Sequence, residues 1–218
     1  MSGIGEASLI LGLISSIITV IDTTKQVYDA VEDEAGLPKN FKKSAAKLPL
    51  ILKLLEDAEK FVGNTPDDSV KAAFTPTLEN CKLQAISLQK LFEKVMPEED
   101  DSRVDRYLKA ARTIGKGGRV ESLILDILRD LQLLATQFPE LTNTRGQGQL
   151  KEAIEEVGKM EPSLPDGFEN TASYAHYGSG AQNINTGTGV QYNNNSTGNM
   201  NTGSGTQYIG TNHIGRPS

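Results

Sequence analysis

Hydrophobic residues recur at three- and four-residue steps along roughly the first 160 positions, which is the spacing of α-helices. The first segment, residues 7–21, has no charged residue and is apolar around its whole circumference. A helix of this kind is normally buried in a bundle or enters a membrane. Gly36 and Pro38 predict its end, because glycine caps helix C-termini and proline cannot continue the hydrogen-bond ladder.

Three later segments carry one apolar face each, and we predict them to be core-facing helices. Pro49 is expected to start or kink the first, and Pro139 to end the last. Charged residues, including Glu121, are expected on the solvent side. The three faces comprise Leu48, Ile51, Leu52, Leu55, Ala58 and Val62; Leu78, Cys81, Ala85, Leu88, Phe92 and Val95; and Val120, Leu123, Ile124, Ile127, Leu131, Leu134 and Phe138.

The remaining segments predict an all-α bundle of five or six helices. Short helices are expected after Ser102 and over 150–160, with a linker at 142–149 and an extended connector at 161–168. No alternating strand pattern precedes residue 165. We therefore divide the chain into a helical bundle at 1–140, a short helix and linker at 141–169, and a tail at 170–218.

Charge separates the tail from the rest. Up to Glu169 there are 21 basic and 28 acidic residues, a net charge of −7, and the one formal charge after Glu169 is Arg216. Nucleic-acid binding needs cations to neutralise phosphates, so we expect no nucleic-acid partner. The lone Cys81 permits no internal disulfide, and the N-terminus lacks the basic residues of a signal peptide. These features predict a cytoplasmic protein.

The sequence contains few candidates for a catalytic site. The stretch IGKGGRVES, residues 114–122, lacks the phosphate-loop spacing G-x-x-x-x-G-K-[ST] and is predicted to be a turn between helices. Cys81 lies on an apolar face, as a buried small hydrophobic residue does. His176 and His213 both lie in the tail, so the bundle lacks the commonest general base. We expect no enzyme activity, cofactor, metal or small-molecule substrate.

The tail repeats itself. NINTGTGVQY at 183–192 returns sixteen residues later as NMNTGSGTQY at 199–208, with seven identities in ten positions. Residues 170–215 contain nine Asn, nine Gly and seven Thr, and no Asp, Glu, Lys or Arg. Such a composition forms no helix. A disordered linker is one reading, but the repetition favours a segment that is disordered as a monomer and forms stacked cross-β or β-solenoid structure on assembly.

An extended chain places amides and glycines on one face of each repeat and mostly apolar, hydroxyl and aromatic side chains on the other. Uncharged strands with Asn/Gln ladders stack readily on identical copies. The residues predicted to make the assembly are Gln182, Asn183, Ile184, Asn185, Gly187, Gly189, Val190, Gln191, Tyr192, Asn199, Met200, Asn201, Gly203, Gly205, Thr206, Gln207 and Tyr208.

Two segments resemble known fungal modules. GLISSIITVIDTTKQVYDA, GLPKNFKKSAAKLPLILKLLEDAEKF, CKLQAISLQKLFEKVMP and RYLKAARTIGKGGRVESLILDILRDLQLLA resemble the SesA-type domain at the N-terminus of NACHT and P-loop NTPases. The tail, GSGAQNINTGTGVQYNNNSTGNMNTGSGTQYIG, resembles the sigma amyloid motif. Together they are similar to a HET-s-like arrangement, although the tail does not match that of HET-s and no NTPase core is present.

The resemblance implies an effector in heterokaryon incompatibility or immune-type programmed cell death. A NACHT/NB-ARC-type receptor carrying a matching sigma motif is the implied partner, and it templates self-assembly through the tail. In the related HeLo-type domains an apolar N-terminal helix is released into the plasma membrane on activation. The matching residues here are Leu9, Ile10, Leu13, Ile14, Ile17, Ile18 and Ile21.

Two alternatives remain open. The fifteen uncharged residues 7–21 form a helix of about 22 Å, which is short of the ~30 Å hydrocarbon core. In the resting monomer this helix is expected to be core. One alternative function is an adaptor, whose bundle binds a partner while the tail is a flexible tether. An enzyme that uses the GKGG segment is the other alternative.

Overall fold

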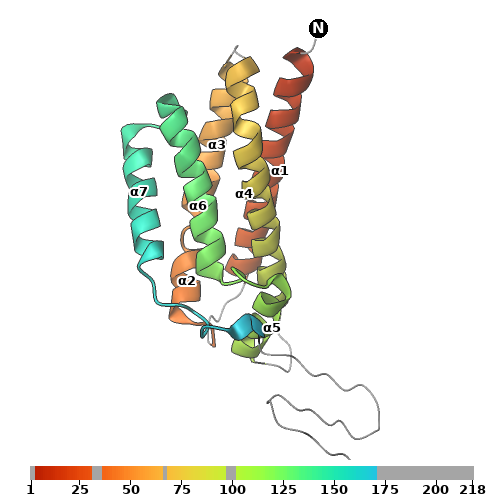
Figure 1. Ribbon diagram of the computed structural model, residues 1–218, viewed down its shortest axis with the longest axis vertical. Helices are drawn as coiled ribbons and strands as arrows, with labels where there is room; N and C mark the ends of the chain where they lie inside the picture. Colours follow the sequence, from red (N-terminus) through yellow and green to blue (C-terminus); the bar gives the residue numbers. More distant parts are fainter. Residues whose placement is uncertain (1–2, 31–35, 66–67, 97–101, 171–218) are drawn as a thin grey trace, which may run out of the picture. The chain divides into compact units, whose positions relative to one another are not determined.

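Helices make up the regular structure of the part of the chain that the structure describes, which confirms the predicted all-α class (Figure 1). The computed structural model describes residues 3–30, 36–65, 68–96 and 102–170. Within these ranges the elements are α1 (Gly3–Asp29), α2 (Lys39–Ala45), α3 (Leu48–Asn64), α4 (Asp68–Val95), α5 (Arg103–Ile114), α6 (Val120–Gln137), η1 (Pro139–Leu141), α7 (Thr144–Gly158) and η2 (Phe168–Asn170).

Four long helices, α1, α3, α4 and α6, lie side by side and form the body of the bundle (Figure 1). Helix α1 lies at one edge and packs on α3 and α4, whereas α7 lies at the other edge and packs mainly on α6. The short helices α2 and α5 lie together at one end (Figure 1). Two neighbours therefore hold α1.

The predicted apolar faces of α3, α4 and α6 lie in the core. All six predicted residues of α4 are fully buried, and so are five of the six in α3, where Leu54 is buried and Leu52 only partly. In α6 six of the seven predicted residues are buried, and Phe138, which follows the helix, is partly buried. The prediction for Glu121 is wrong, because Glu121 is 7% exposed and lies inside rather than on the solvent side. Glu121 is on the first turn of α6, where the chain after α7 covers it.

Prolines set helix starts, as predicted for Pro49, which occupies the first turn of α3. Pro38 plays the corresponding part as the N-cap of α2, a seven-residue helix that the periodicity did not reveal. Pro139 follows the end of α6 and begins η1.

The glycine-rich segment after α5 is a turn between helices. Gly115 and Gly117 have φ angles of 86° and 94°, which other residues rarely adopt. A Cβ on Gly118 would lie 2.4 Å from the carbonyl oxygen of Ala111, so only glycine fits there. The glycines thus bring α6 back against α4.

The linker predicted at 142–149 is wrong from Thr144 onward, because these residues form the first turns of α7. The side chain of Asn143 caps this helix by accepting a hydrogen bond of 2.9 Å from the backbone N–H of Gly146. The chain divides into two units, the compact Met1–Thr171 and the remaining Ala172–Ser218. The second unit, which holds all the predicted assembly residues, lies outside the described residues.

Candidate functional site

Helix α1 presents one row of isoleucines to the core. Ile10, Ile14, Ile17 and Ile21 are at most 4% exposed, and their four- and three-residue steps place them on a single face. This face packs on α3 and α4. Four of the seven residues predicted for a membrane helix are therefore core residues in this state.

The other three predicted residues lie off this face. Leu13 and Ile18 are partly buried, and Leu9 is 74% exposed. Ser8–Asp29 is also the segment among the described residues that is long and apolar enough to cross a membrane, and 28% of its most apolar 18-residue window is buried. A buried core helix passes the same test of length and composition, so the test leaves both roles open for α1.

Four hydroxyl groups of α1 are bonded within the helix, and a fifth reaches α3. The side chains of Thr19, Thr23 and Thr24 donate to carbonyl oxygens four residues earlier at 2.7–2.9 Å. Ser16 donates to the carbonyl of Leu13, and Ser15 to the carboxylate of Glu59 on α3. Since the hydroxyls carry their partners with them, an apolar surrounding would leave few of them unpaired.

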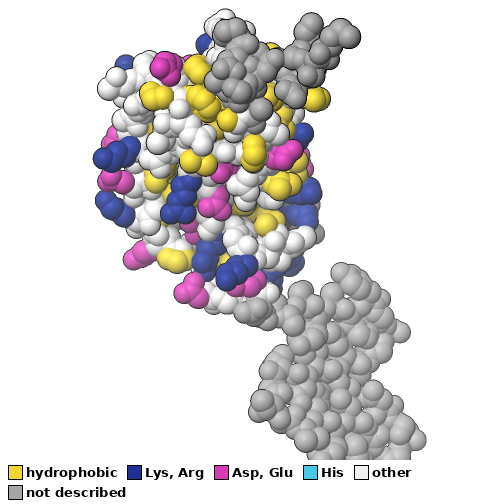
Figure 2. Space-filling view, turned by 45° about the horizontal axis from the view of Figure 1, so that its top comes forward, with side chains coloured by type: hydrophobic (Ala, Val, Ile, Leu, Met, Phe, Trp, Pro, Cys, Tyr) yellow, Lys and Arg dark blue, Asp and Glu magenta, His cyan; other side chains and the backbone are white. Residues whose placement is uncertain are grey.

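Hydrophobic side chains also reach the surface elsewhere on the bundle. Figure 2 shows them in yellow on one face, between blue basic and magenta acidic side chains. Besides Leu9, the large exposed hydrophobic residues are Leu83 at 64%, Leu133 at 48% and Val104 at 43%. They lie on α4, α6 and α5, so each stands on a different helix.

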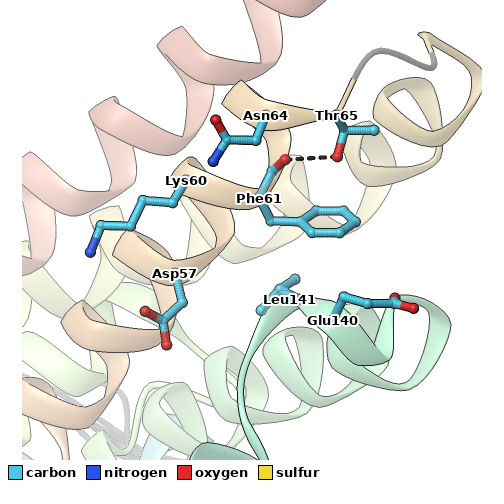
Figure 3. A pocket seen from close by; sticks show the side chains of 7 residues that line it. All are labelled: Asp57, Lys60, Phe61, Asn64, Thr65, Glu140 and Leu141. Atoms are coloured by element: carbon cyan, nitrogen blue, oxygen red, sulfur yellow. Dashed lines mark hydrogen bonds between the residues drawn. The ribbon is translucent and has the colours of Figure 1, made fainter.

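A pocket of 410 Å³ opens between the end of α3 and η1 (Figure 3). Phe61 and Leu141 supply apolar surface, and the ionisable groups around it diverge. Figure 3 shows Asp57 and Lys60 directed to one side and Glu140 to the other. Because general acid–base catalysis needs groups that converge on one reacting atom, this arrangement gives no catalytic pair.

The second candidate site is the chain between α7 and the tail. Residues 159–169, here called the strap, run from the end of α7 to η2 without forming an α-helix. Leu164 and Phe168 are each 4% exposed, so the segment predicted as an extended connector is anchored in the core.

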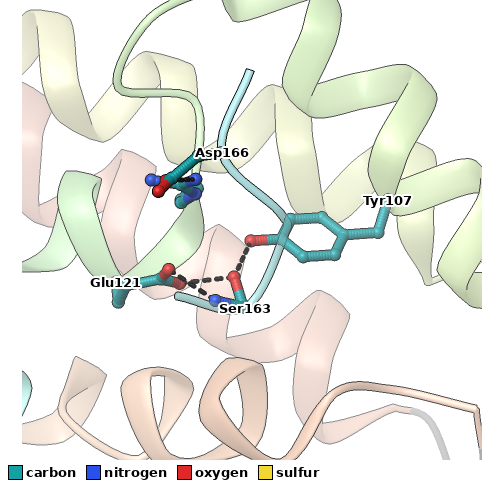
Figure 4. A network of polar contacts seen from close by, with 5 residues as sticks. Tyr107, Glu121, Ser163 and Asp166 are labelled. Atoms are coloured by element: carbon teal, nitrogen blue, oxygen red, sulfur yellow. Dashed lines mark hydrogen bonds and ion pairs between the residues drawn. The ribbon is translucent and has the colours of Figure 1, made fainter. Parts of the chain in front are cut away.

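A chain of hydrogen bonds fixes the middle of the strap (Figure 4). The carboxylate of Glu121 accepts the backbone N–H of Ser163 at 2.8 Å and the Ser163 hydroxyl at 2.6 Å. With its proton directed at Glu121, Ser163 Oγ accepts from the Tyr107 hydroxyl at 2.6 Å, which in turn accepts the N–H of Val120 at 3.0 Å. Every polar group of this partly buried chain has a partner.

The Tyr107 hydroxyl stays protonated and acts as a donor. Burial raises the pKa of this phenol, and the negative charge of Glu121 raises it further. The Tyr107 ring itself is fully buried and meets Phe41 edge-on, with ring centroids 5.0 Å apart. The hydrogen-bond chain is thus built on the core.

Arginines hold the far end of the strap. Arg119 Nη2 lies 2.7 Å from Asp166 Oδ1, and the guanidinium lies 5.2 Å from the centroid of the Phe168 ring. Arg112 Nε donates to the Phe168 carbonyl at 3.0 Å. At the near end, Asn40 of α2 donates to the Glu161 carbonyl at 2.7 Å.

The sequence analysis missed these residues. The large apolar residues of the strap, Met160, Leu164 and Phe168, are interrupted by two prolines and a glycine, which exclude an amphipathic helix, and Tyr107 lies in a mostly polar helix, so neither pattern indicates burial. Gly167 is the available signal: its φ of 75° turns the chain so that Phe168 enters the core, and an isolated Asp-Gly-Phe after two prolines predicts such a turn.

The described part of the chain offers neither a metal-binding group of side chains nor a reactive thiol. No group of three or more His, Cys, Asp or Glu there is placed to hold a metal ion. As predicted, Cys81 is fully buried, and burial raises the pKa of its thiol, with a smaller contribution from the charge of Asp130. A thiol in this setting is a poor nucleophile.

Comparison with protein families gives one match. Residues 14–134, more than half of the chain, match the model of SesA, described as the N-terminal domain on NACHT NTPases and P-loop NTPases. The match begins within α1 and ends within α6. In the same comparisons, no curated protein and no solved structure matches the chain.

Proposed function

Because this chain belongs to the SesA family of domains on NACHT NTPases and P-loop NTPases, we propose that it is the signalling effector of a NACHT-type receptor. The observation that carries the proposal is the order of modules. A helical SesA domain is followed by an uncharged tail with a sixteen-residue repeat. In this proposal the nucleotide-dependent step belongs to the receptor.

The tail is the input of this effector. A matching sigma motif on the receptor templates residues 178–210, whose two repeats stack with Gln191 and Gln207 in amide ladders. Each added copy extends the stack and brings another bundle alongside. The tail's lack of charge supports this step, since like charges would repel in register.

The bundle is the output, and α1 is its active element in programmed cell death or heterokaryon incompatibility. The resting fold keeps Ile14 and Ile17 in the core. On activation α1 leaves α3 and α4 and enters the plasma membrane from the cytoplasm. Its edge position, charge-free segment 7–21 and internally bonded hydroxyls support this step.

The test compares the full chain with a chain ending at residue 171, the end of the first compact unit. Fibres of the tail segment are introduced into cells that express either form, and aggregation and death are scored together. We expect the full chain to join the aggregates and kill, whereas the shortened chain stays diffuse and harmless. If the shortened chain kills as efficiently, the tail is a tether and the adaptor function replaces this one.

A further inference from the structure

The strap is bound to the helices in the manner of a short peptide ligand. Its contacts are made by side chains at defined positions: the hydroxyl of Ser163, the carboxylate of Asp166, and the apolar groups of Leu164 and Phe168. The receiving surface consists of α2, α5 and the first turn of α6, and its polar residues are Asn40, Tyr107, Arg112, Arg119 and Glu121.

Charge and hydrogen-bonding are complementary along this surface. Glu121 receives the two donors of Ser163, and Figure 4 shows Ser163 between Glu121 and Tyr107. Arg119 pairs with the exposed carboxylate of Asp166 and lies over the Phe168 ring. A segment with another order of side chains would leave the buried Glu121 carboxylate unpaired, which is costly.

The strap is also prepared for binding. Pro162 and Pro165 are exposed, and each restricts the backbone around it to extended conformations. Gly167 supplies the turn that lets Phe168 enter the core. Since part of the conformational entropy is removed before binding, the segment can recognise its surface without the support of regular secondary structure.

We propose that the surface of α2, α5 and α6 binds the strap of a second copy of the chain in place of its own. Apart from Lys159 and Met160, whose backbone N–H groups cap α7 by donating to the carbonyls of Glu155 and Val157, the strap contributes no turn to the α-helices, so the rest of it can leave without breaking a helical ladder. The strap of another copy brings the same side chains and makes the same contacts. An exchange of this kind is domain swapping.

The position of the strap favours exchange between assembled copies. It directly precedes the tail, and the proposed function stacks tails together, so neighbouring straps reach effective concentrations in the millimolar range. Only the high local concentration of straps rests on the proposed function, because binding of a strap from another copy needs no stacked tail. Exchange links successive bundles through folded contacts.

The experiment uses the full chain with Leu164→Ala and Phe168→Ala, which weaken its own strap. A fluorescent peptide of residues 159–169 is added, and its anisotropy is measured. We expect saturable binding, and binding at least tenfold weaker for the peptide that carries Ser163→Ala and Phe168→Ala. A peptide that does not bind, or binds equally well in both forms to a chain of unchanged helical content, overturns the proposal.

A second measurement covers the case in which the weakened chain does not fold. A copy with Ser163→Cys is mixed with a copy with Glu121→Cys, each otherwise unchanged, and disulfide-linked dimers are measured. Thr136→Cys, exposed on α6, replaces Glu121→Cys in the control. We expect several-fold more dimer from the first mixture than from the control, and equal amounts contradict the exchange. Both measurements are made on unassembled protein, so failure of tail stacking affects neither.

Discussion

Replacement of Gln191 and Gln207 by lysine is expected to abolish fibre formation by the full chain. In a stack of identical strands, residues of successive copies lie ~4.8 Å apart, so each lysine meets its own copy above and below. Two charges at this distance repel by about 1 kcal/mol even in water, and the cost recurs at every added copy. Thioflavin fluorescence should show no growth, or a lag at least tenfold longer, over the time in which the wild type converts completely.

The control places the same chemical change on the bundle. Gln132→Lys with Gln137→Lys adds two charges to α6, where Gln137 is exposed, and should leave assembly at the wild-type rate. Both variants should unfold at the wild-type temperature, since neither alters a core residue. Fibres of Q191K/Q207K growing at the wild-type rate would show that the amides form no ladder.

The pair Ile17→Ala and Ile18→Ala separates the two roles of α1. Ile17 is fully buried and Ile18 only partly, although the residues are adjacent and chemically identical. Truncation of a buried isoleucine costs about 2–5 kcal/mol, so Ile17→Ala should lower the free energy of unfolding by that amount and Ile18→Ala by less than half of it. Urea unfolding of the monomer, followed by circular dichroism, measures both losses.

Membrane entry should not distinguish these positions. A helix surrounded by lipid exposes all its faces, so both substitutions reduce its hydrophobicity equally. Dye release from vesicles by the assembled protein should therefore fall to the same extent in the two variants. Equal losses of stability would contradict the one-sided burial of α1, and dye release that follows stability would assign α1 to the core alone.

The periodicity of the sequence predicted the long helices well because their burial is one-sided. In the predicted face from Leu78 to Val95, successive residues are three or four positions apart, and each is buried in α4. Helix α2 was not predicted, because a helix of seven residues has too few turns to show a hydrophobic period. In α7, Gly146 and Gly148 gave the first turns the composition of a linker, and the packing of Gly146 against Thr142 explains the first of them.

The strap could not be predicted for a different reason. Its burial depends on partners far away in sequence: Ser163 pairs with Glu121, and Phe168 with Arg119 and Arg112. Local patterns do not contain such pairings. The same holds for Glu121, which has the sequence context of a solvent-facing residue and becomes buried because the strap supplies donors for its carboxylate.

The most direct test of the account is seeded assembly of the full chain in solution. Fibres of the segment 170–218 are added at a few per cent to monomeric protein, and X-ray diffraction and circular dichroism of the product are recorded. The account predicts growth without a lag, cross-β reflections near ~4.7 Å and ~10 Å, and retained helical signal from the bundle. Full chain that remains monomeric beside the seeds would contradict it.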